Sequence, residues 1–279
     1  MLTAILAAFG GGLLGAMLGA LPAFIMCGFV CLAGTIPGVD FFGNVAFGAF
    51  FCPCISFAGG VAATAYAHSK KEIDNGQSLD SIMHTNDPMG LVIGGIFGIL
   101  GYLLNYLFAT VIKFNTDTVA LAVMTSGIIA RLVFGKTGVF GKYGKDEKHP
   151  LMGNVAMDVV FGLGIGLLVA FGYEVLPSEW GANYYQNMCF GIAASSLVFG
   201  SMGKTSIGFH HVIAPAAGAT VMLGPVYGVI FAVIGSLLGD FLGCLYNNDH
   251  CDSHIDPPAG AIFIQMWIIN LLAGKPFLG

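Results

Sequence analysis

Two segments of the sequence combine a proline with side chains that could bind a ligand, followed by small residues. Thiols and imidazoles are ligands for soft metals such as Cu(I) and for Zn, and hydroxyls and imidazoles can hydrogen-bond a solute. We predict a substrate site formed by Cys52, Pro53, Cys54, Ser56, His210, His211 and Thr220. Four of these residues, Cys52, Cys54, His210 and His211, are also candidate metal ligands.

The stretch Cys52-Pro53-Cys54 resembles, over three residues, the Cys-Pro-Cys of a membrane helix in heavy-metal P-type ATPases. The resemblance implies that the two thiols could hold a soft metal ion. The phosphorylated Asp-Lys-Thr-Gly motif of that family is absent from this sequence. A copper or zinc transporter that uses Cys and His ligands is therefore one alternative function.

The charged residues inside or near the predicted spans are Asp158, Asp240, Arg131 and Glu174, and the first three need a functional or structural reason. Asp240 and Asp158 are candidates for ion coupling, because a carboxylate in a membrane can carry a proton or a sodium ion. Arg131 could neutralise a carboxylate in a buried pair, or its head group could reach the membrane surface by snorkelling.

The composition sets the environment in which these side chains must work. Of 279 residues, 56% are hydrophobic and only 9% are charged, 42 are glycine, and the mean hydropathy is +0.84. An ordinary soluble protein carries about 25% charged residues, so we predict a polytopic membrane protein surrounded by a lipid bilayer. Ten Lys and Arg against fifteen Asp and Glu offer no basic patch, which argues against a nucleic-acid partner.

Long apolar runs predict an all-α protein, because they lack the alternation of a membrane β-barrel. The first run is too long for one spanning helix of about 20 residues, and we divide it at Pro22, because an interior proline breaks a helix. About ten membrane elements result. The runs cover residues 2–36, 41–67, 89–112, 118–135, 155–176, 188–202, 207–223, 226–246 and 259–272.

The two halves of the sequence resemble each other. Residues 90–108 align without gaps to residues 228–246, and the next run in each half opens with an aspartate. An odd number of elements per unit makes the second copy enter the membrane from the opposite side, which is typical of secondary transporters. We therefore predict two five-element inverted repeats, residues 1–135 and 155–279, joined by a cytoplasmic linker, residues 136–154. Matching positions include Gly12 and Gly166, Met26-Cys27 and Met188-Cys189, Gly90 and Gly228, Gly101 and Gly239, and Asp117 and Asp256.

The third element of each half, residues 43–64 and 203–220, is the least helical in composition. Backbone groups freed by Pro and Gly must be buried in protein or line a wet cavity, so a broken helix in each half predicts a substrate site between them. The alternatives are a kinked, tightly packed helix, or a re-entrant element, which would leave four spans per unit and make the repeat parallel.

The basic residues predict the orientation. With ten spans, eight of the ten fall on the side opposite the termini, which places that side in the cytoplasm and both termini outside, in a plasma (inner) membrane. Only Lys113 and Lys275 lie on the terminal side. The eight are Lys70, Lys71, Arg131, Lys136, Lys142, Lys145, Lys148 and Lys204.

These features favour a secondary-active transporter or facilitator that moves a small solute or ion through a mid-membrane site between two broken helices. Coupling to protons or sodium and assembly as a homo-oligomer are left open. The alternative is a membrane subunit of an enzyme or redox complex, although the sequence contains no Gly-x-Ser-x-Gly and no His-Glu-x-x-His motif. We therefore expect no enzyme activity. The sequence does not identify the substrate, and it does not distinguish a channel from a coupled transporter.

Overall fold

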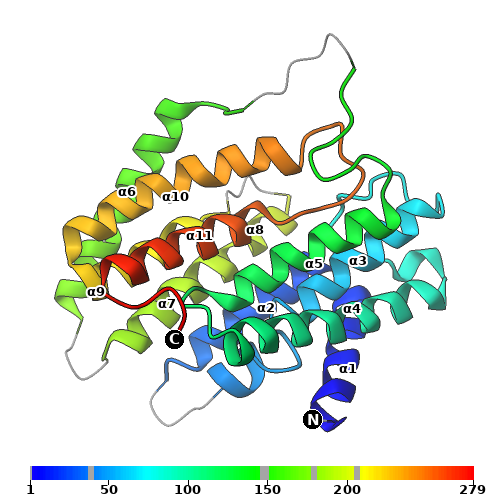
Figure 1. The fold of residues 1–279 in the computed structure, drawn as a ribbon, viewed down its shortest axis with the longest axis horizontal. Coiled ribbons are helices and arrows are strands. Elements are labelled where there is room, and N and C mark those ends of the chain that lie inside the picture. The colour runs from blue at the N-terminus through cyan, green and yellow to red at the C-terminus, as the bar shows by residue number, and fades with distance from the viewer. Residues whose placement is uncertain (1, 37–40, 145–150, 177–180, 204–207) are drawn as a thin grey trace.

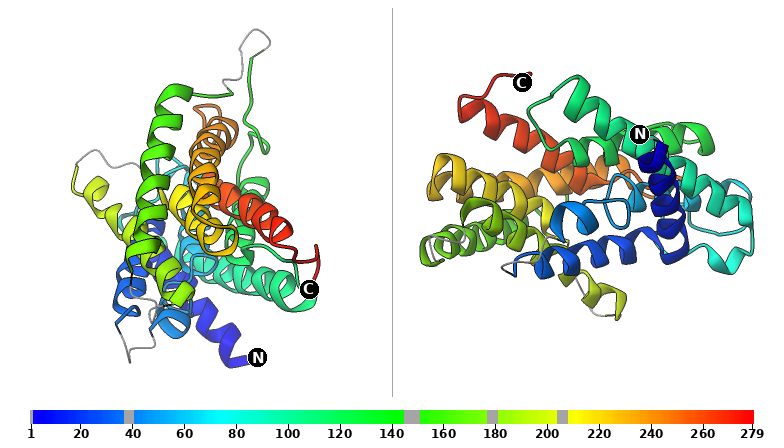
Figure 2. Two further views of the ribbon diagram at one scale, coloured as in Figure 1. Left: turned by 90° about the vertical axis from the view of Figure 1, so that its left-hand side faces the viewer. Right: turned by 90° about the horizontal axis from the view of Figure 1, so that it is seen from below.

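The structure is a computed structural model that describes residues 2–36, 41–144, 151–176, 181–203 and 208–279. The described chain is all-α, as predicted, and its only β feature is an isolated bridge between Phe114 and Leu278. Most helices lie side by side with similar tilt, as Figures 1 and 2 show.

Each half contributes the same series of five longer helices. The first half contains α1 (Leu2–Leu18), α2 (Ala20–Ala33), the π-helix η1 (Phe42–Ala46), α3 (Ser56–Ser69), the 3₁₀ turn η2 (Met83–Thr85), α4 (Pro88–Tyr106) with its π-helical extension η3 (Leu107–Val111), and α5 (Thr118–Phe134). The second half contains α6 (Val155–Val175), α7 (Gly181–Ser196), the short α8 (Val198–Ser201), α9 (His210–Leu223), α10 (Pro225–Tyr246) and α11 (Pro257–Leu272).

The first apolar run is broken at Gly19, and the predicted division at Pro22 is therefore three residues too late. Gly19 has φ +97°, a conformation that favours glycine, and the axes of α1 and α2 differ by 114°. Pro22 lies in the first turn of α2, where a missing N–H costs no helical hydrogen bond.

The third element is broken in both halves, but Pro215 is not the site of the break. Residues 47–55 are not helical and contain Pro53, whereas α9 starts at His210 and continues through Pro215. A proline leaves the carbonyl four residues earlier without its helical donor. That carbonyl belongs to His211, and it accepts a hydrogen bond from Gln265 Nε2 at 3.2 Å, which allows the helix to continue.

Within the described residues, three helices are long and apolar enough to cross a membrane, which corrects the expectation of about ten. They are Pro88–Val111, Val155–Val175 and Pro225–Tyr246, and the bent pair α1 and α2 raises the number to four if it counts as one span. α5 and α11 each cover a predicted run but have only 17 and 16 residues, and the run 41–67 is divided between η1 and α3.

Glycines allow equivalent helices of the two halves to pack closely. On α1, a Cβ at Gly12 would lie 2.2 Å from the carbonyl oxygen of Gly94 on α4. On α6, a Cβ at Gly166 would lie 2.9 Å from Cβ of Ala232 on α10. The sequence alignment pairs Gly12 with Gly166, and it pairs Gly94 with Ala232, so both halves repeat the same contact.

Two pairs of equivalent helices meet across the boundary between the halves, and both run antiparallel. Thr116, just before α5, donates to the carbonyl of Phe263 on α11, while Gly127 on α5 lies beside Ile255, just before α11. As the residue numbers increase along α5, the numbers of the contacting residues decrease along α11, so the two helices are antiparallel. The helices α2 and α7 behave in the same way, with Gly28 against Ala194 and Leu32 against Gly191.

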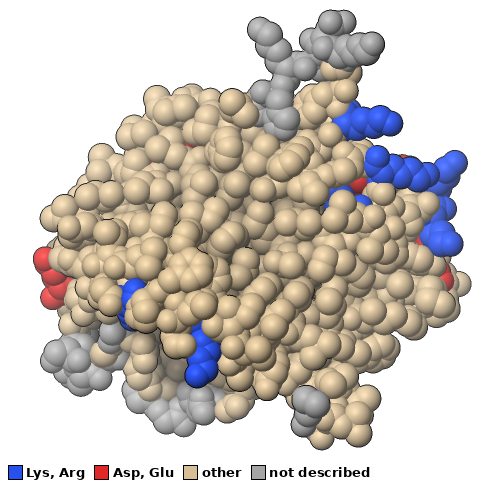
Figure 3. Space-filling view, in the orientation of Figure 1, with Lys and Arg blue, Asp and Glu red and all other residues tan. Residues whose placement is uncertain are grey.

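The broad face shown in Figure 3 carries few charged side chains, and Lys and Arg gather mainly at its right-hand end, with others toward its lower edge. At one end of the bundle, the loops after α3, α5 and α10 meet: Gln77 bonds to the carbonyl of Asn248, and the Lys142 N–H bonds to the carbonyl of His250. On α6, large apolar side chains are exposed, including Val160 at 67% and Leu168 at 69%. Such a surface suits lipid better than water.

Candidate functional site: a cavity between the two halves

A cavity of about 420 Å³ lies between the two halves, large enough for a small organic molecule. Its wall comes from α2, the irregular segment before α3, and α5 of the first half, and from α7, α9 and α11 of the second. The polar side chains that line it are Asp117, Gln186, Asn187, His210, His254 and Asp256.

The two halves contribute equivalent positions to this cavity. Asp117, Val119, Ala120 and Val123 line it from α5 and its cap, and Asp256, Pro258, Ala259 and Ile262 line it with identical spacing from α11 and its cap. Because α5 and α11 are antiparallel, the cavity lies between two equivalent surfaces that run in opposite directions.

Both aspartates cap the helix that follows them. Asp117 Oδ1 accepts the Ala120 N–H at 2.9 Å, and Asp256 Oδ2 accepts the Ala259 N–H at 2.7 Å. These bonds satisfy N–H groups that a helix terminus leaves without partners. They also place one carboxylate at each of two helix N-termini facing the same cavity.

Asp256 has a second donor that comes from His254. His254 Nε2 lies 3.2 Å from Asp256 Oδ1, and His254 Nδ1 lies 3.1 Å from Asn247 Nδ2. The Asn247 side-chain oxygen already accepts from the Ile255 N–H at 3.0 Å. The amide NH₂ of Asn247 therefore donates to His254 Nδ1, which assigns the proton to Nε2 and directs it to Asp256.

Arg131 supports this chain of hydrogen bonds and does not snorkel. It is fully buried, and it donates to the Asn247 side-chain oxygen at 3.4 Å, to Ser253 Oγ at 3.1 Å and to the Val139 carbonyl at 2.8 Å. The guanidinium is thus bound to a hydroxyl, an amide and a carbonyl, and it joins the loop after α5 to the loop before α11.

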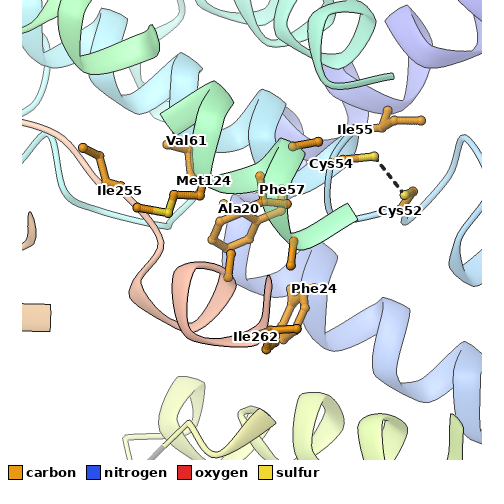
Figure 4. Close-up of a cluster of buried hydrophobic side chains, with 14 of the residues drawn as sticks. Ala20, Phe24, Cys52, Cys54, Ile55, Phe57, Val61, Met124, Ile255 and Ile262 are labelled. Carbon is orange, nitrogen blue, oxygen red and sulfur yellow. Dashed lines mark hydrogen bonds between the residues drawn. The ribbon is translucent and has the colours of Figure 1, made fainter. Parts of the chain in front are cut away.

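Phenylalanines form much of the remaining wall. Phe24 on α2 packs edge-on against Phe57 and Phe190, with ring centroids 6.0 Å and 5.7 Å away. Figure 4 shows Phe24 close to Ile262 of α11, so residues from both halves enclose the cavity. Phe42 and Phe47 complete the aromatic wall.

The neighbouring histidines have different surroundings, as their adjacency in a helix requires. His210 lines the cavity and packs against the Phe24 ring at 4.8 Å, and its Nδ1 is buried without a hydrogen-bond partner. The His211 ring lies nearly perpendicular, at 88° to that of His210, and a Cβ at Gly239 would meet its Nε2 at 2.2 Å.

Only Pro53 and His210 among the seven predicted substrate-binding residues line the cavity. The Ser56 hydroxyl donates to the Cys52 carbonyl, and the Thr220 hydroxyl donates to the Ala216 carbonyl, so both groups bond within their own segment. Cys52 and Cys54 are buried, and their sulfur atoms lie 3.2 Å apart, as Figure 4 shows for the two side chains. The cysteines lie beside the cavity wall rather than on it.

The candidate metal ligands do not form a coordination cluster in the described part of the chain. No group of three or more His, Cys, Asp or Glu side chains that could hold a metal ion occurs among the described residues. Structural zinc sites need four ligands, and Cys52 with Cys54 supplies two. The geometry gives the metal hypothesis no support.

The two ion-coupling candidates lie together at a separate place, between α6 and α10. Ser236 on α10 lies 3.4 Å from Asp158 Oδ1, and Asp240 follows Ser236 by one helical turn on the same face. The Asp240 carboxylate lies close enough to act electrostatically on Asp158, whose Oδ2 is buried without a hydrogen-bond partner. Asp240 also accepts the Gly153 N–H at 2.5 Å.

A second cavity of about 400 Å³ lies among the loops at the end where Gln77 meets Asn248. It is lined by His68, Asp74, Asp249, His250, Cys251 and Asp252, among others. Burial raises the pKa of the Cys251 thiol, which keeps it protonated at neutral pH and makes it a poor metal ligand.

Sequence reasoning missed Asp117, His254 and Asp256 as residues of the site. Both aspartates precede equivalent apolar runs in the sequence, and each caps the helix that follows it. The signal that could have found them is duplication, because an aspartate that recurs at the same repeat position can face its counterpart across a symmetric cavity. The phenylalanines carry no such signal in an apolar sequence.

Comparison with known proteins identifies a family and nothing more specific. The model of a family of unknown function, DUF7973, matches residues 1–152 and matches again over residues 150–278. The protein belongs to this family. No curated protein and no solved structure matches the chain.

Proposed function

We propose that this protein is an integral membrane transporter or facilitator, and that the cavity between its halves is the substrate site. The observation that carries the proposal is the matched lining of the cavity by α5 and α11, which run antiparallel. A site between two equivalent, oppositely directed units can open to either side of a membrane by the same movement, which is the principle of transporters with inverted repeats.

The arrangement of the halves supports an inverted repeat. A two-fold axis that lies along the helices would make equivalent helices parallel, whereas α5 with α11 and α2 with α7 are antiparallel. The axis that relates them is therefore perpendicular to the helices, in the plane of a membrane that the helices cross. Two successive matches to one family model support the same division of the chain.

The positions of the basic residues support an orientation of the protein in the membrane. Lys70 and Lys71 follow α3, and Lys136 and Lys142 follow α5, at the end where these loops meet. By the positive-inside rule this end faces the cytoplasm. Both termini then lie outside the cytoplasm, and the membrane is the plasma (inner) membrane.

Asp158 and Asp240 are the proposed coupling pair. Two carboxylates that share a contact between helices can bind one proton or one sodium ion more readily than an isolated carboxylate. Because the pair lies on α6 and α10, outside the cavity lining, ion binding there would act through the packing of these two helices.

Transport is tested with purified full-length protein in liposomes. Uptake of radiolabelled choline, alanine, glucose and lactate is measured with and without an imposed proton or sodium gradient. Gradient-driven uptake supports a secondary transporter, and uptake that ignores both gradients supports a facilitator or channel. Uptake of all four solutes no faster than in protein-free liposomes contradicts the proposal.

A pair of variants links any uptake to the cavity. Ala259→Phe adds a ring to the cavity wall and should stop uptake. Ile230→Phe adds a ring on α10 at a position that is 46% exposed and should leave uptake unchanged. Equal uptake by both variants would exclude this cavity as the path.

A further inference from the structure

We propose that the ligand of the cavity is a small organic monocation, an alkylammonium whose charge lies between Asp117 and Asp256. The inference rests on the proposed function, because it names the substrate class of the same cavity. Four features of the wall support it: its charges, its hydrogen bonds, its aromatic rings and an unpartnered histidine.

The charges of the wall favour a cation. Two carboxylates line the cavity, and none of the described lining residues is Lys or Arg. Each carboxylate faces a helix N-terminus, which is equivalent to about +0.5 elementary charge. With both carboxylates ionised, the net charge that remains is roughly −1, which matches a single positive charge and disfavours an anion.

The hydrogen bonds to Asp256 favour its ionised form. It accepts from the Ala259 N–H and from His254 Nε2, and donors to a carboxylate stabilise its negative charge. Because Asn247 donates to His254 Nδ1, the imidazole is neutral and its proton belongs to Nε2. The histidine therefore orients and stabilises the carboxylate without cancelling its charge.

The aromatic wall favours alkyl groups around that charge. The Phe24 ring makes contacts with Phe57, Phe190 and the His210 ring at 4.8 to 6.0 Å between centroids. Phenylalanine faces attract cations but offer no hydrogen bond, so they suit an ammonium that carries methyl or methylene groups. A bare metal ion would lack ligands, because no described group of three or more metal-binding side chains exists.

His210 adds a polar group that still requires a partner. The side chain lines the cavity with 7% of its surface exposed, and its Nδ1 makes no hydrogen bond within the described structure. A buried polar group is usually paired, so a hydroxyl or an N–H of the ligand would complete it after a small rotation of the ring. An alkylammonium that also carries a hydroxyl fits this wall best.

The test measures binding to the purified full-length protein in detergent by isothermal titration calorimetry. The probes are choline, tetramethylammonium, lactate, and 3,3-dimethylbutan-1-ol, which replaces the nitrogen of choline with carbon and has no charge. We expect choline to bind at least about tenfold more tightly than its neutral analogue, which corresponds to the cation–π and ionic interactions of a desolvated site. Equal affinity for the two, tighter binding of lactate, or no binding of either cation would overturn the assignment.

Three matched variants test the role of the carboxylates. Asn caps a helix as well as Asp does, so Asp117→Asn and Asp256→Asn keep the fold and remove the charge. Each should weaken choline binding about tenfold or more, while binding of the neutral analogue stays the same. Asp87→Asn likewise keeps the cap and removes the charge, but on α4, outside the cavity, and should change neither affinity. Unchanged choline affinity in both cavity variants would overturn the proposal.

Binding and transport fail in different ways. Choline binding that depends on Asp117 and Asp256, without uptake of any solute into liposomes, would keep the ligand class and remove the transport function. Uptake of alanine, glucose or lactate without binding of either cation would keep transport and overturn the ligand class.

Discussion

Gly239 lies directly against the imidazole of His211, so that a Cβ at Gly239 would meet Nε2 at 2.2 Å. The equivalent glycine of the first half, Gly101, lies against the backbone of Cys54, where a Cβ would meet the carbonyl oxygen at 1.5 Å. In both halves, the fourth long helix uses one glycine to accommodate the start of the third element. This contact fixes the position of the segments that border the cavity.

We predict that Gly101→Ala destabilises the protein more than Gly239→Ala does. A backbone carbonyl cannot rotate away from the new methyl group, whereas an imidazole can shift, and overpacking costs about 1–3 kcal/mol. Thermal unfolding in detergent measures the difference. Gly243→Ala is the control on α10, because nothing lies within 4 Å of its Cβ. Equal stability of Gly101→Ala and Gly243→Ala would contradict the packing described above.

The adjacent histidines should respond differently to substitution. His210→Ala opens the cavity wall and should weaken choline binding with little loss of stability, because the ring already borders empty space. His211→Ala leaves a void beside Gly239 and should lower the thermal stability, with a smaller effect on affinity. Calorimetry and thermal unfolding of both variants provide the comparison. The reverse assignment of the two effects would show that the wrong histidine has been placed at the site.

Arg131 should be essential for stability rather than for charge balance. Arg131→Lys keeps the charge but cannot reach Ser253, Val139 and Asn247 together, and each lost bond to a charged donor costs about 1.5–3 kcal/mol. We therefore expect the free energy of unfolding, measured by thermal unfolding in detergent, to fall by several kcal/mol. Lys136→Met, at an exposed position in the loop after α5, should not change the free energy of unfolding. A stable Arg131→Lys would indicate a snorkelling side chain after all.

Removal of one carboxylate from the coupling pair should stabilise the fold and abolish coupling. Asp158→Asn and Asp240→Asn each end the repulsion across the contact between α6 and α10, so we expect stability equal to or up to about 1 kcal/mol above the wild type. Solute uptake in liposomes should then no longer respond to a proton or sodium gradient. Glu174→Gln, at the opposite end of α6, is the control. Gradient-driven uptake in both Asp variants would remove the pair from the mechanism.

Much of the architecture follows from the sequence because apolar runs and caps act locally. Asp87, Asp117 and Asp256 each start a helix by accepting a backbone N–H, as their residue type and the prolines after two of them indicate. The resemblance of residues 90–108 to residues 228–246 likewise predicts that α4 and α10 have the same neighbours. The first helix break was predicted at Pro22 instead of Gly19, because an interior proline is the stronger local indicator of a break.

The sequence by itself determined an all-α chain rich in apolar residues, the aspartate caps that start α4, α5 and α11, and the similarity of its halves. These properties depend on side chains that lie a few residues apart. Only the tertiary structure decided which polar groups share a cavity. Asp117, His210 and Asp256 come together because α5 and α11 cross antiparallel and α9 starts beside them. Such contacts depend on how distant helices pack, and in an apolar chain many pairings look alike until the glycines fix one of them.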